Sequence, residues 1–149
     1  MTKPIGRRAD YLWFTPITTR WMDNDAYQHV NNVVYYSWFD TAVARFLLAE
    51  VLPAAPGLVG FVVETQCRYH APMSFPDDVM VGLRIERLGT SSIRYGIGVF
   101  RNDDDRASAE GHFVHVHVDR ATGRPKPTPE AARAAFERFM PGRPATATA

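Results

Sequence analysis

The chain has 149 residues, of which 46% are hydrophobic and 22% are charged, as is typical of a globular protein. The formal net charge is +1, from 17 basic and 16 acidic residues, so nucleic-acid binding driven by bulk charge is not indicated. The single cysteine, Cys67, excludes an intramolecular disulfide. We expect one domain over residues 1–149, with flexible ends at residues 1–10 and 142–149.

The sequence contains no recognisable targeting or membrane-spanning segment. No long apolar run follows the basic residues of 1–10. The longest interior apolar stretch, about residues 58–63, is far shorter than the ~20 residues that span a bilayer. We therefore expect a cytoplasmic protein with no membrane partner, and a free cysteine fits a reducing compartment.

In the first third of the chain, the patterns predict a strand, a loop and a long helix. Apolar residues alternate over 11–21 and predict a strand, which Pro16 makes irregular or confines to a sheet edge. Residues 22–32 are strongly polar and predict a loop. Apolar residues then recur at steps of three and four over 33–52, which predicts one helix of about five turns that ends at Pro53.

The rest of the chain predicts a sheet and a short helix. Alternating apolar residues predict strands in 58–69, 79–85, 93–99 and 114–118, and a short helix is predicted over 129–140. One long apolar helix with one antiparallel sheet is an α+β architecture. Because open sheet edges have to be paired or covered, we expect an oligomer.

The densest polar segment, residues 20–32, directly precedes the predicted long helix. A helix N-terminus presents unpaired N–H groups and about half a positive charge, which polarise a carbonyl and stabilise an oxyanion. Asp25 could attack that carbonyl or activate a water. Asp25 and the amides of Asn31 and Asn32 would make a minimal acyl-transfer site. The alternative is a loop of ordinary turn and capping residues.

The run from Arg20 to Arg45 closely resembles the hotdog-fold acyl-CoA thioesterases of the 4-hydroxybenzoyl-CoA thioesterase-like family. That family's motif is approximately Asp-x-Asp-x-x-Gly-His-Val-Asn-Asn-x-x-Tyr. This chain matches it at Asp23, Asp25, His29, Val30, Asn31, Asn32 and Tyr35. The segments 68–72 and 76–78 resemble the second strand of the family and its turn.

The resemblance implies a fold, a reaction and an assembly. A five-stranded antiparallel sheet would wrap the long helix, and two subunits would join edge to edge with active sites at the interface. The expected assembly is a homodimer, with dimers pairing into a homotetramer. The substrate would be an acyl-CoA thioester, and Asp25 would be the catalytic carboxylate. No metal and no organic cofactor are implied.

The resemblance also implies roles for neighbouring residues. The backbone N–H groups of Asn32 and Asn31 would polarise the thioester carbonyl. Supporting roles are expected for three residues of the segment 20–32: His29, Asp23 and Gln28. Contacts with substrate are expected for Tyr35, on the helix, and Glu64, which could reach the site of a neighbouring subunit.

Gln28 departs from the pattern, because the family usually has glycine there. Glycine permits positive φ and close approach of a substrate. Gln28 could narrow the substrate path, or the loop could adopt another conformation. This departure keeps open a second hypothesis, a non-catalytic protein that binds acyl thioesters or hydrophobic ligands. A dehydratase is disfavoured because Asp25 and His29 are four residues apart, where the dehydratase branch has five.

Three histidines near the end of the sheet raise the question of a metal site. His115 and His117 would share one face of a strand while His112 points the other way, which does not make a convergent set of ligands. We expect these histidines on a polar outer face or between dimers. Cys67 is expected to be an inert core residue. Coenzyme A phosphates could bind Arg94, Arg101 or the basic residues of the C-terminal segment.

Overall fold

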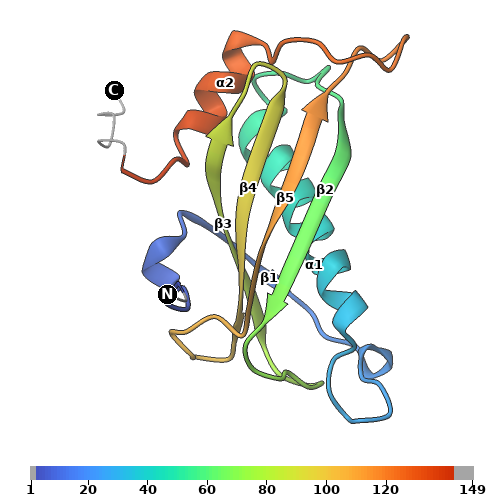
Figure 1. Ribbon diagram of the computed structural model, residues 1–149, viewed down its shortest axis with the longest axis vertical. Helices are drawn as coiled ribbons and strands as arrows, with labels where there is room; N and C mark the ends of the chain where they lie inside the picture. Colours follow the sequence, from blue (N-terminus) through green and yellow to red (C-terminus); the bar gives the residue numbers. More distant parts are fainter. Residues whose placement is uncertain (1–2, 143–149) are drawn as a thin grey trace.

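The structure is a computed structural model that describes residues 3–142 (Figure 1). The main elements in chain order are β1 (Trp13–Ile17), α1 (Asn32–Phe46), β2 (Gly60–Tyr69), β3 (Val79–Leu88), β4 (Ser92–Arg101), β5 (Ala109–His117) and α2 (Glu130–Glu137). The strands form one antiparallel sheet in the order β1-β3-β4-β5-β2. The α+β architecture, with a five-stranded antiparallel sheet and one long helix, is confirmed.

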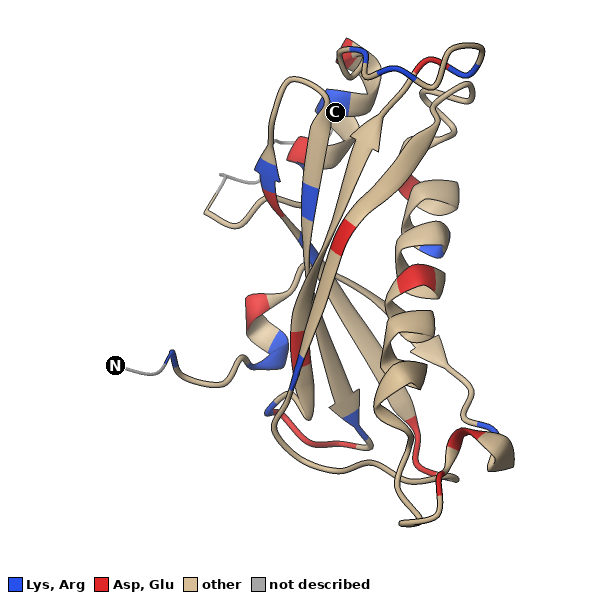
Figure 2. Ribbon diagram, turned by 45° about the vertical axis from the view of Figure 1, so that its right-hand side comes forward, with Lys and Arg blue, Asp and Glu red and all other residues tan. Residues whose placement is uncertain are grey.

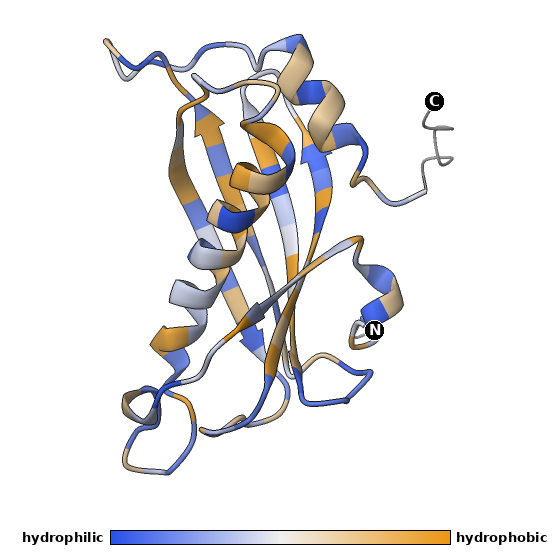
Figure 3. Cartoon of the chain, turned by 180° about the vertical axis from the view of Figure 1, so that it is seen from behind, coloured by the Kyte–Doolittle hydropathy of each residue, from blue (hydrophilic) through white to orange (hydrophobic). Residues whose placement is uncertain are grey.

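Helix α1 lies across one face of the sheet, in front of the strands in Figure 3. Its buried residues recur at steps of three and four: Tyr35, Trp38, Phe39, Ala42, Val43 and Phe46. They pack against inward-facing strand residues such as Leu83, Ile93 and Ile97, all completely buried. Full burial of each large apolar side chain contributes about 1.5–3 kcal/mol, so this layer is the main source of stability.

The predicted helix over 33–52 has a change of geometry near its end. The α-helix begins at Asn32 and ends at Phe46, and a π-helical turn continues it from Leu47 to Val51. Val51 is completely buried, so the wider turn keeps its side chain in the core.

Within residues 3–142, no helix has the length and apolar character needed to cross a membrane.

The predicted strand over 11–21 is shorter in the structure. β1 covers only Trp13–Ile17, and the chain then forms a 3₁₀ turn at Trp21–Asp23. Within residues 1–10, which the sequence predicts to be flexible, the structure has a 3₁₀ turn at Arg8–Asp10, and the Gly6 N–H donates to Glu110 at 2.9 Å. Residues 1–2 and 143–149 lie outside the described part of the chain.

The N-terminal segment packs on the outer face of the sheet, where Tyr11 is buried. A Cβ atom at Gly98 would come within 2.6 Å of the Tyr11 ring. Glycine at position 98 therefore lets the ring lie directly on the strand.

In strand β2, the expected alternation of apolar and polar residues does not hold along the whole strand. A bulge between Val62 and Glu64 shifts the register, so Val62 pairs with His115 whereas Glu64 pairs with Val114. The inward-facing positions change parity at this bulge. β2 is also an edge strand, and every residue in it except the half-buried Cys67 is exposed.

Strand β5 begins earlier than the predicted 114–118, at Ala109. Gly111 and His112 interrupt the apolar alternation there, so the pattern conceals the first half of the strand. The orientation of His115 and His117 is also corrected. Both rings face the core, because the His115 ring packs edge-on against Tyr95 and the His117 ring stacks on Phe136.

Candidate active site

The loop between the 3₁₀ turn and α1 closes on itself through backbone hydrogen bonds. Asn24 and Val30 form an isolated β-bridge. The Asp25 N–H donates to the His29 carbonyl at 2.9 Å, and the Gln28 N–H donates to the Asp25 carbonyl at 3.0 Å. These bonds give the segment 24–30 one defined shape. Acidic residues of this region lie beside the N-terminal end of α1 (Figure 2).

Gln28 has a φ of 63°, in the left-handed region that glycine adopts without steric cost. The loop therefore keeps a positive φ at this position, although the residue is not glycine. The Gln28 carbonyl accepts a hydrogen bond of 2.7 Å from the Ser74 hydroxyl, which ties the loop to the turn before β3.

Asp23 and Asp25 occupy different environments although they are two residues apart. The Asp23 side chain is buried, and its carboxylate accepts hydrogen bonds from the backbone and guanidinium of Arg20. Asp25 is half-exposed, and its Oδ1 accepts one hydrogen bond of 2.9 Å from the Tyr27 N–H. Its Oδ2 accepts none from residues 3–142. Asp25 is thus oriented by a local turn and keeps one oxygen available.

At the N-terminus of α1, the described part of the chain leaves the Asn32 backbone donor unused. Asn31 is the N-cap, and its Oδ1 accepts from the Val33 N–H at 3.1 Å. The Asn31 N–H donates to the Asp23 carbonyl at 2.9 Å, so it is already engaged. The Asn32 N–H donates to no group in the described part of the chain. Of the two donors expected from the sequence, only the one at Asn32 is free.

An open pocket of about 300 Å³ lies beside this helix end. It is lined by the loop, the first turn of α1 and the segment that leaves β2: His29, Val30, Asn32, Tyr35, Tyr69, His70, Ala71 and Pro72. Tyr35 is buried, and this burial raises the pKa of its hydroxyl to about 12, so the hydroxyl stays protonated near neutral pH. The pocket brings together three residues expected from the sequence: His29, Asn32 and Tyr35.

Two expected residues do not line this pocket. Asp25 lies in the loop that borders it but is not among the lining residues. Glu64 lies on the outer face of the sheet, where its Oε1 is 3.3 Å from Nε2 of His112. Tyr69 and His70 line the pocket but were not expected to do so. Their signal in the sequence was the segment 68–72, which indicated only a strand and its turn.

Burial shifts the pKa values of His115, His117 and Cys67 in the sheet. His115 Nδ1 lies 3.3 Å from the Tyr95 hydroxyl, and His117 Nδ1 lies 2.6 Å from the Thr128 hydroxyl. Burial lowers the pKa of both imidazoles from 6.5 to about 4. Burial likewise raises the pKa of the Cys67 thiol to about 11. Residues 3–142 contain no cluster of three or more histidine, cysteine or acidic side chains that could hold a metal ion.

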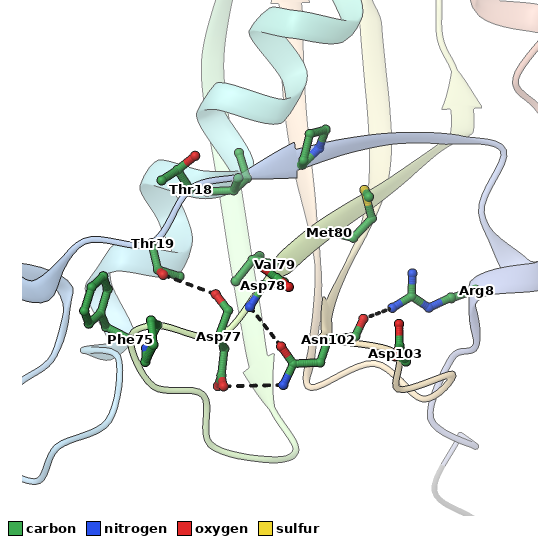
Figure 4. Close-up of a pocket in the computed structure, with 13 residues that line it drawn as sticks. Arg8, Thr18, Thr19, Phe75, Asp77, Asp78, Val79, Met80, Asn102 and Asp103 are labelled. Carbon is green, nitrogen blue, oxygen red and sulfur yellow. Dashed lines mark hydrogen bonds between the residues drawn. The ribbon is translucent and has the colours of Figure 1, made fainter.

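A larger pocket, of about 860 Å³, lies below the β1–β3 edge of the sheet (Figure 4). Many of its polar groups hydrogen-bond to one another. The Thr19 hydroxyl donates to the Asp77 carbonyl, and the Asp78 N–H donates to the Asn102 side chain. Asp77 also forms an ion pair of 3.0 Å with Arg101, one of the residues considered for phosphate binding. Arg94, also considered for phosphate binding, forms an ion pair of 3.2 Å with Glu86.

The sequence family decides how the helix-end pocket is interpreted. The thioesterase-like superfamily matches residues 19–136, which include the loop, α1 and the whole sheet after β1. The chain belongs to the thioesterase-like superfamily. Its architecture is accordingly the hotdog fold, and thioester hydrolysis is the activity that this membership supports.

Solved structures agree with this family. The PA5185 protein of Pseudomonas aeruginosa is 44% identical, with a TM-score of 0.86 over 92% of this chain and 97% of that chain. A Thermus thermophilus thioesterase complexed with coenzyme A and zinc is 30% identical, with a TM-score of 0.72 over 85% of this chain and 98% of that one. A gentisyl-coenzyme A thioesterase is 26% identical, with a TM-score of 0.72 over 84% of this chain and 99% of that one. No curated protein sequence matches the chain.

Proposed function

We propose that this member of the thioesterase-like superfamily hydrolyses acyl-CoA thioesters, with Asp25 as the catalytic carboxylate. The observation that carries the proposal is the Asn32 N–H at the N-terminus of α1, which has no partner within residues 3–142 and lies beside a loop that presents a carboxylate oxygen. A thioester carbonyl oxygen that accepted this N–H would also lie at the positive end of the helix dipole. The coenzyme A bound to the Thermus thermophilus thioesterase supports the choice of carrier.

Two routes use the same two residues. In the first, Asp25 attacks the carbonyl carbon, the C–S bond breaks and the CoA thiolate takes a proton from water. A second water then hydrolyses the mixed anhydride and restores the carboxylate. In the second, Asp25 takes a proton from the attacking water, and that proton passes to the departing thiolate. Both routes place the developing negative charge on the oxygen that faces the Asn32 N–H.

His29, Asp23 and Gln28 support this site through the loop that carries Asp25. The His29 carbonyl accepts the Asp25 N–H, and the buried Asp23 anchors the start of the loop to Arg20. Tyr35 contributes one wall of the pocket. A contribution from Glu64 would require a neighbouring subunit, because in this chain it faces away from the pocket.

The same proposal includes a homodimer that can pair into a tetramer. β2 is an edge strand, and its exposed residues include Phe61 and Val63, which are 53% and 59% exposed. An exposed apolar edge strand favours pairing with a second copy. Sedimentation equilibrium of the unliganded protein tests this oligomeric state directly, because it gives the mass of the assembly in solution. We also propose a cytoplasmic location, where reducing conditions would keep Cys67 as a free thiol.

The decisive experiment measures thiol release from short, long and aromatic acyl-CoA substrates by the wild type and by Asp25→Asn. We expect turnover by the wild type and a loss of several orders of magnitude in the variant. Asp103→Asn is the matched control, because it makes the same chemical change at an exposed turn and should retain full activity. Release that persisted in Asp25→Asn would remove Asp25 from the mechanism. No release from any substrate would favour the non-catalytic binding protein.

A further inference from the structure

The hydroxyl of Tyr69 contacts the first residue of α1. Tyr69 is the last residue of β2, and its hydroxyl donates to the Asn32 carbonyl at 2.7 Å. The Tyr69 ring packs edge-on against the Tyr35 ring, with 5.0 Å between centroids and an interplanar angle of 89°. Because Tyr35 is buried in the core, this packing fixes the direction of the Tyr69 side chain.

The same peptide group is also held from its other side. The Asn32 carbonyl and the Val33 N–H belong to one peptide, and this N–H donates to the Asn31 side chain at 3.1 Å. The peptide before it is held as well, because the Asn31 carbonyl accepts from the Val34 N–H at 2.9 Å. Both peptides that flank the Asn32 α-carbon are therefore oriented by hydrogen bonds. The Asn32 N–H is left unpartnered between them within residues 3–142.

We propose that Tyr69 is a positioning residue that holds the Asn32 N–H in line with the thioester carbonyl. This inference rests on the proposed function, because it assigns a role in polarising the substrate. The hydroxyl is suited to the role because it remains a proton donor at neutral pH. Partial desolvation raises the pKa of the Tyr69 hydroxyl above its ordinary value, although the side chain as a whole is exposed.

The direction of the Asn32 N–H matters because a hydrogen bond weakens steeply when the N–H points away from its acceptor. A well-placed oxyanion donor is worth about 10²–10³ in rate, and small misplacements of reacting groups cost up to about 10². Loss of the Tyr69 hydroxyl leaves the N–H present but frees one side of the adjoining peptide. We therefore expect kcat to fall by about 10- to 100-fold, with KM unchanged within about twofold.

The test compares Tyr69→Phe with Tyr36→Phe. Both variants remove one phenol oxygen near the start of α1, but the Tyr36 hydroxyl makes no hydrogen bond in the described part of the chain. Steady-state thiol release gives kcat and KM for each variant, and thermal unfolding gives the melting temperature. The Tyr36→Phe variant should behave as the wild type in all three measurements.

A spectroscopic measurement separates positioning from a merely structural role. An aryl-CoA labelled with ¹³C at the thioester carbonyl is bound to Asp25→Asn, which prevents turnover, and its carbonyl band is recorded by difference infrared spectroscopy. We expect the band at lower wavenumber than in solution. Adding Tyr69→Phe should move it back towards the solution value, whereas adding Tyr36→Phe should leave it in place.

The outcomes distinguish this inference from the proposed function. An unchanged kcat and an unmoved band in the Tyr69→Phe background would overturn the positioning role while leaving Asp25 and the hydrolysis intact. A melting temperature lowered by more than about 5 °C with an unmoved band would make Tyr69 structural and overturn it as well. Absence of thiol release by the wild type would overturn the proposed function, and the positioning role with it.

Discussion

Arg20 and Asp23 are joined by three hydrogen bonds across a single 3₁₀ turn. One Asp23 oxygen accepts the Arg20 backbone N–H at 2.8 Å, and the other accepts two guanidinium nitrogens at 3.1 and 2.9 Å. The Asp23 carboxylate is only 1% exposed, although the Arg20 side chain is 63% exposed. Its neighbour Asp25 is half-exposed and has no ionic partner among residues 3–142. The two carboxylates of one short motif therefore have separable roles.

Substitution of Asp23 should affect stability more than chemistry. Asp23→Ala leaves the Arg20 N–H and guanidinium without their acceptor, and we expect it to lower the free energy of unfolding by about 2 kcal/mol. Asp25→Asn should change that free energy by less than about 0.5 kcal/mol, because it removes no buried contact. Urea titrations of the two variants test the contrast. Equal losses of stability would contradict the assignment of Asp23 as the structural member.

Gln28 carries a backbone strain that glycine would relieve. Left-handed backbone costs a non-glycine residue roughly 1–2 kcal/mol, although glycine loses more entropy on folding. We expect Gln28→Gly to leave the free energy of unfolding unchanged or to raise it by up to about 1 kcal/mol. Gln28→Val should lower it, because β-branched residues tolerate positive φ least. Chemical denaturation of both variants measures the difference, and a strongly destabilised Gln28→Gly would contradict the observed φ.

The buried histidines predict a loss of stability in mild acid. Burial lowers the pKa of His115 and His117 from 6.5 to about 4, so the folded state binds fewer protons than the unfolded chain between these values. Their contribution is complete above pH 6.5 and is lost as the pH falls towards 4, by at most roughly 3 kcal/mol for each group. Urea midpoints between pH 4 and 8 should follow this dependence.

The variant that tests this acid dependence is His117→Asn. It removes a buried imidazole with a lowered pKa and should flatten the pH profile. If the urea midpoint of His117→Asn fell with pH as steeply as that of the wild type, other groups would be the cause of the acid sensitivity.

Cys67 should react slowly with thiol reagents. Burial raises the pKa of its thiol to about 11, so little thiolate is present at pH 8. We expect modification by a disulfide reagent to be at least about tenfold slower than that of free cysteine, and Cys67→Ser to retain full hydrolytic activity. A rapid reaction at pH 8, or loss of activity in Cys67→Ser, would contradict the expectation that Cys67 is inert.

Local patterns of the sequence predicted the architecture and the position of the candidate site. The apolar steps of α1, the alternation in β3 and β4, and the polar segment 20–32 before a capped helix are all short-range properties. Side-chain periodicity and N-capping act within a few residues, so they can be read along the chain. The α+β class, the long helix and the placement of Asp25 before its N-terminus followed from these patterns and from the family resemblance.

Tertiary structure alone decided which groups are available at the site. The Asn31 N–H is engaged because the Asp23 carbonyl folds back onto it, and the Asn32 carbonyl is held by Tyr69, 37 positions along the chain. The bulge in β2 and the inward rings of His115 and His117 likewise depend on pairing with distant strands. Such contacts carry no local periodic signal. They arise when backbone donors and acceptors far apart in sequence satisfy one another in the folded sheet.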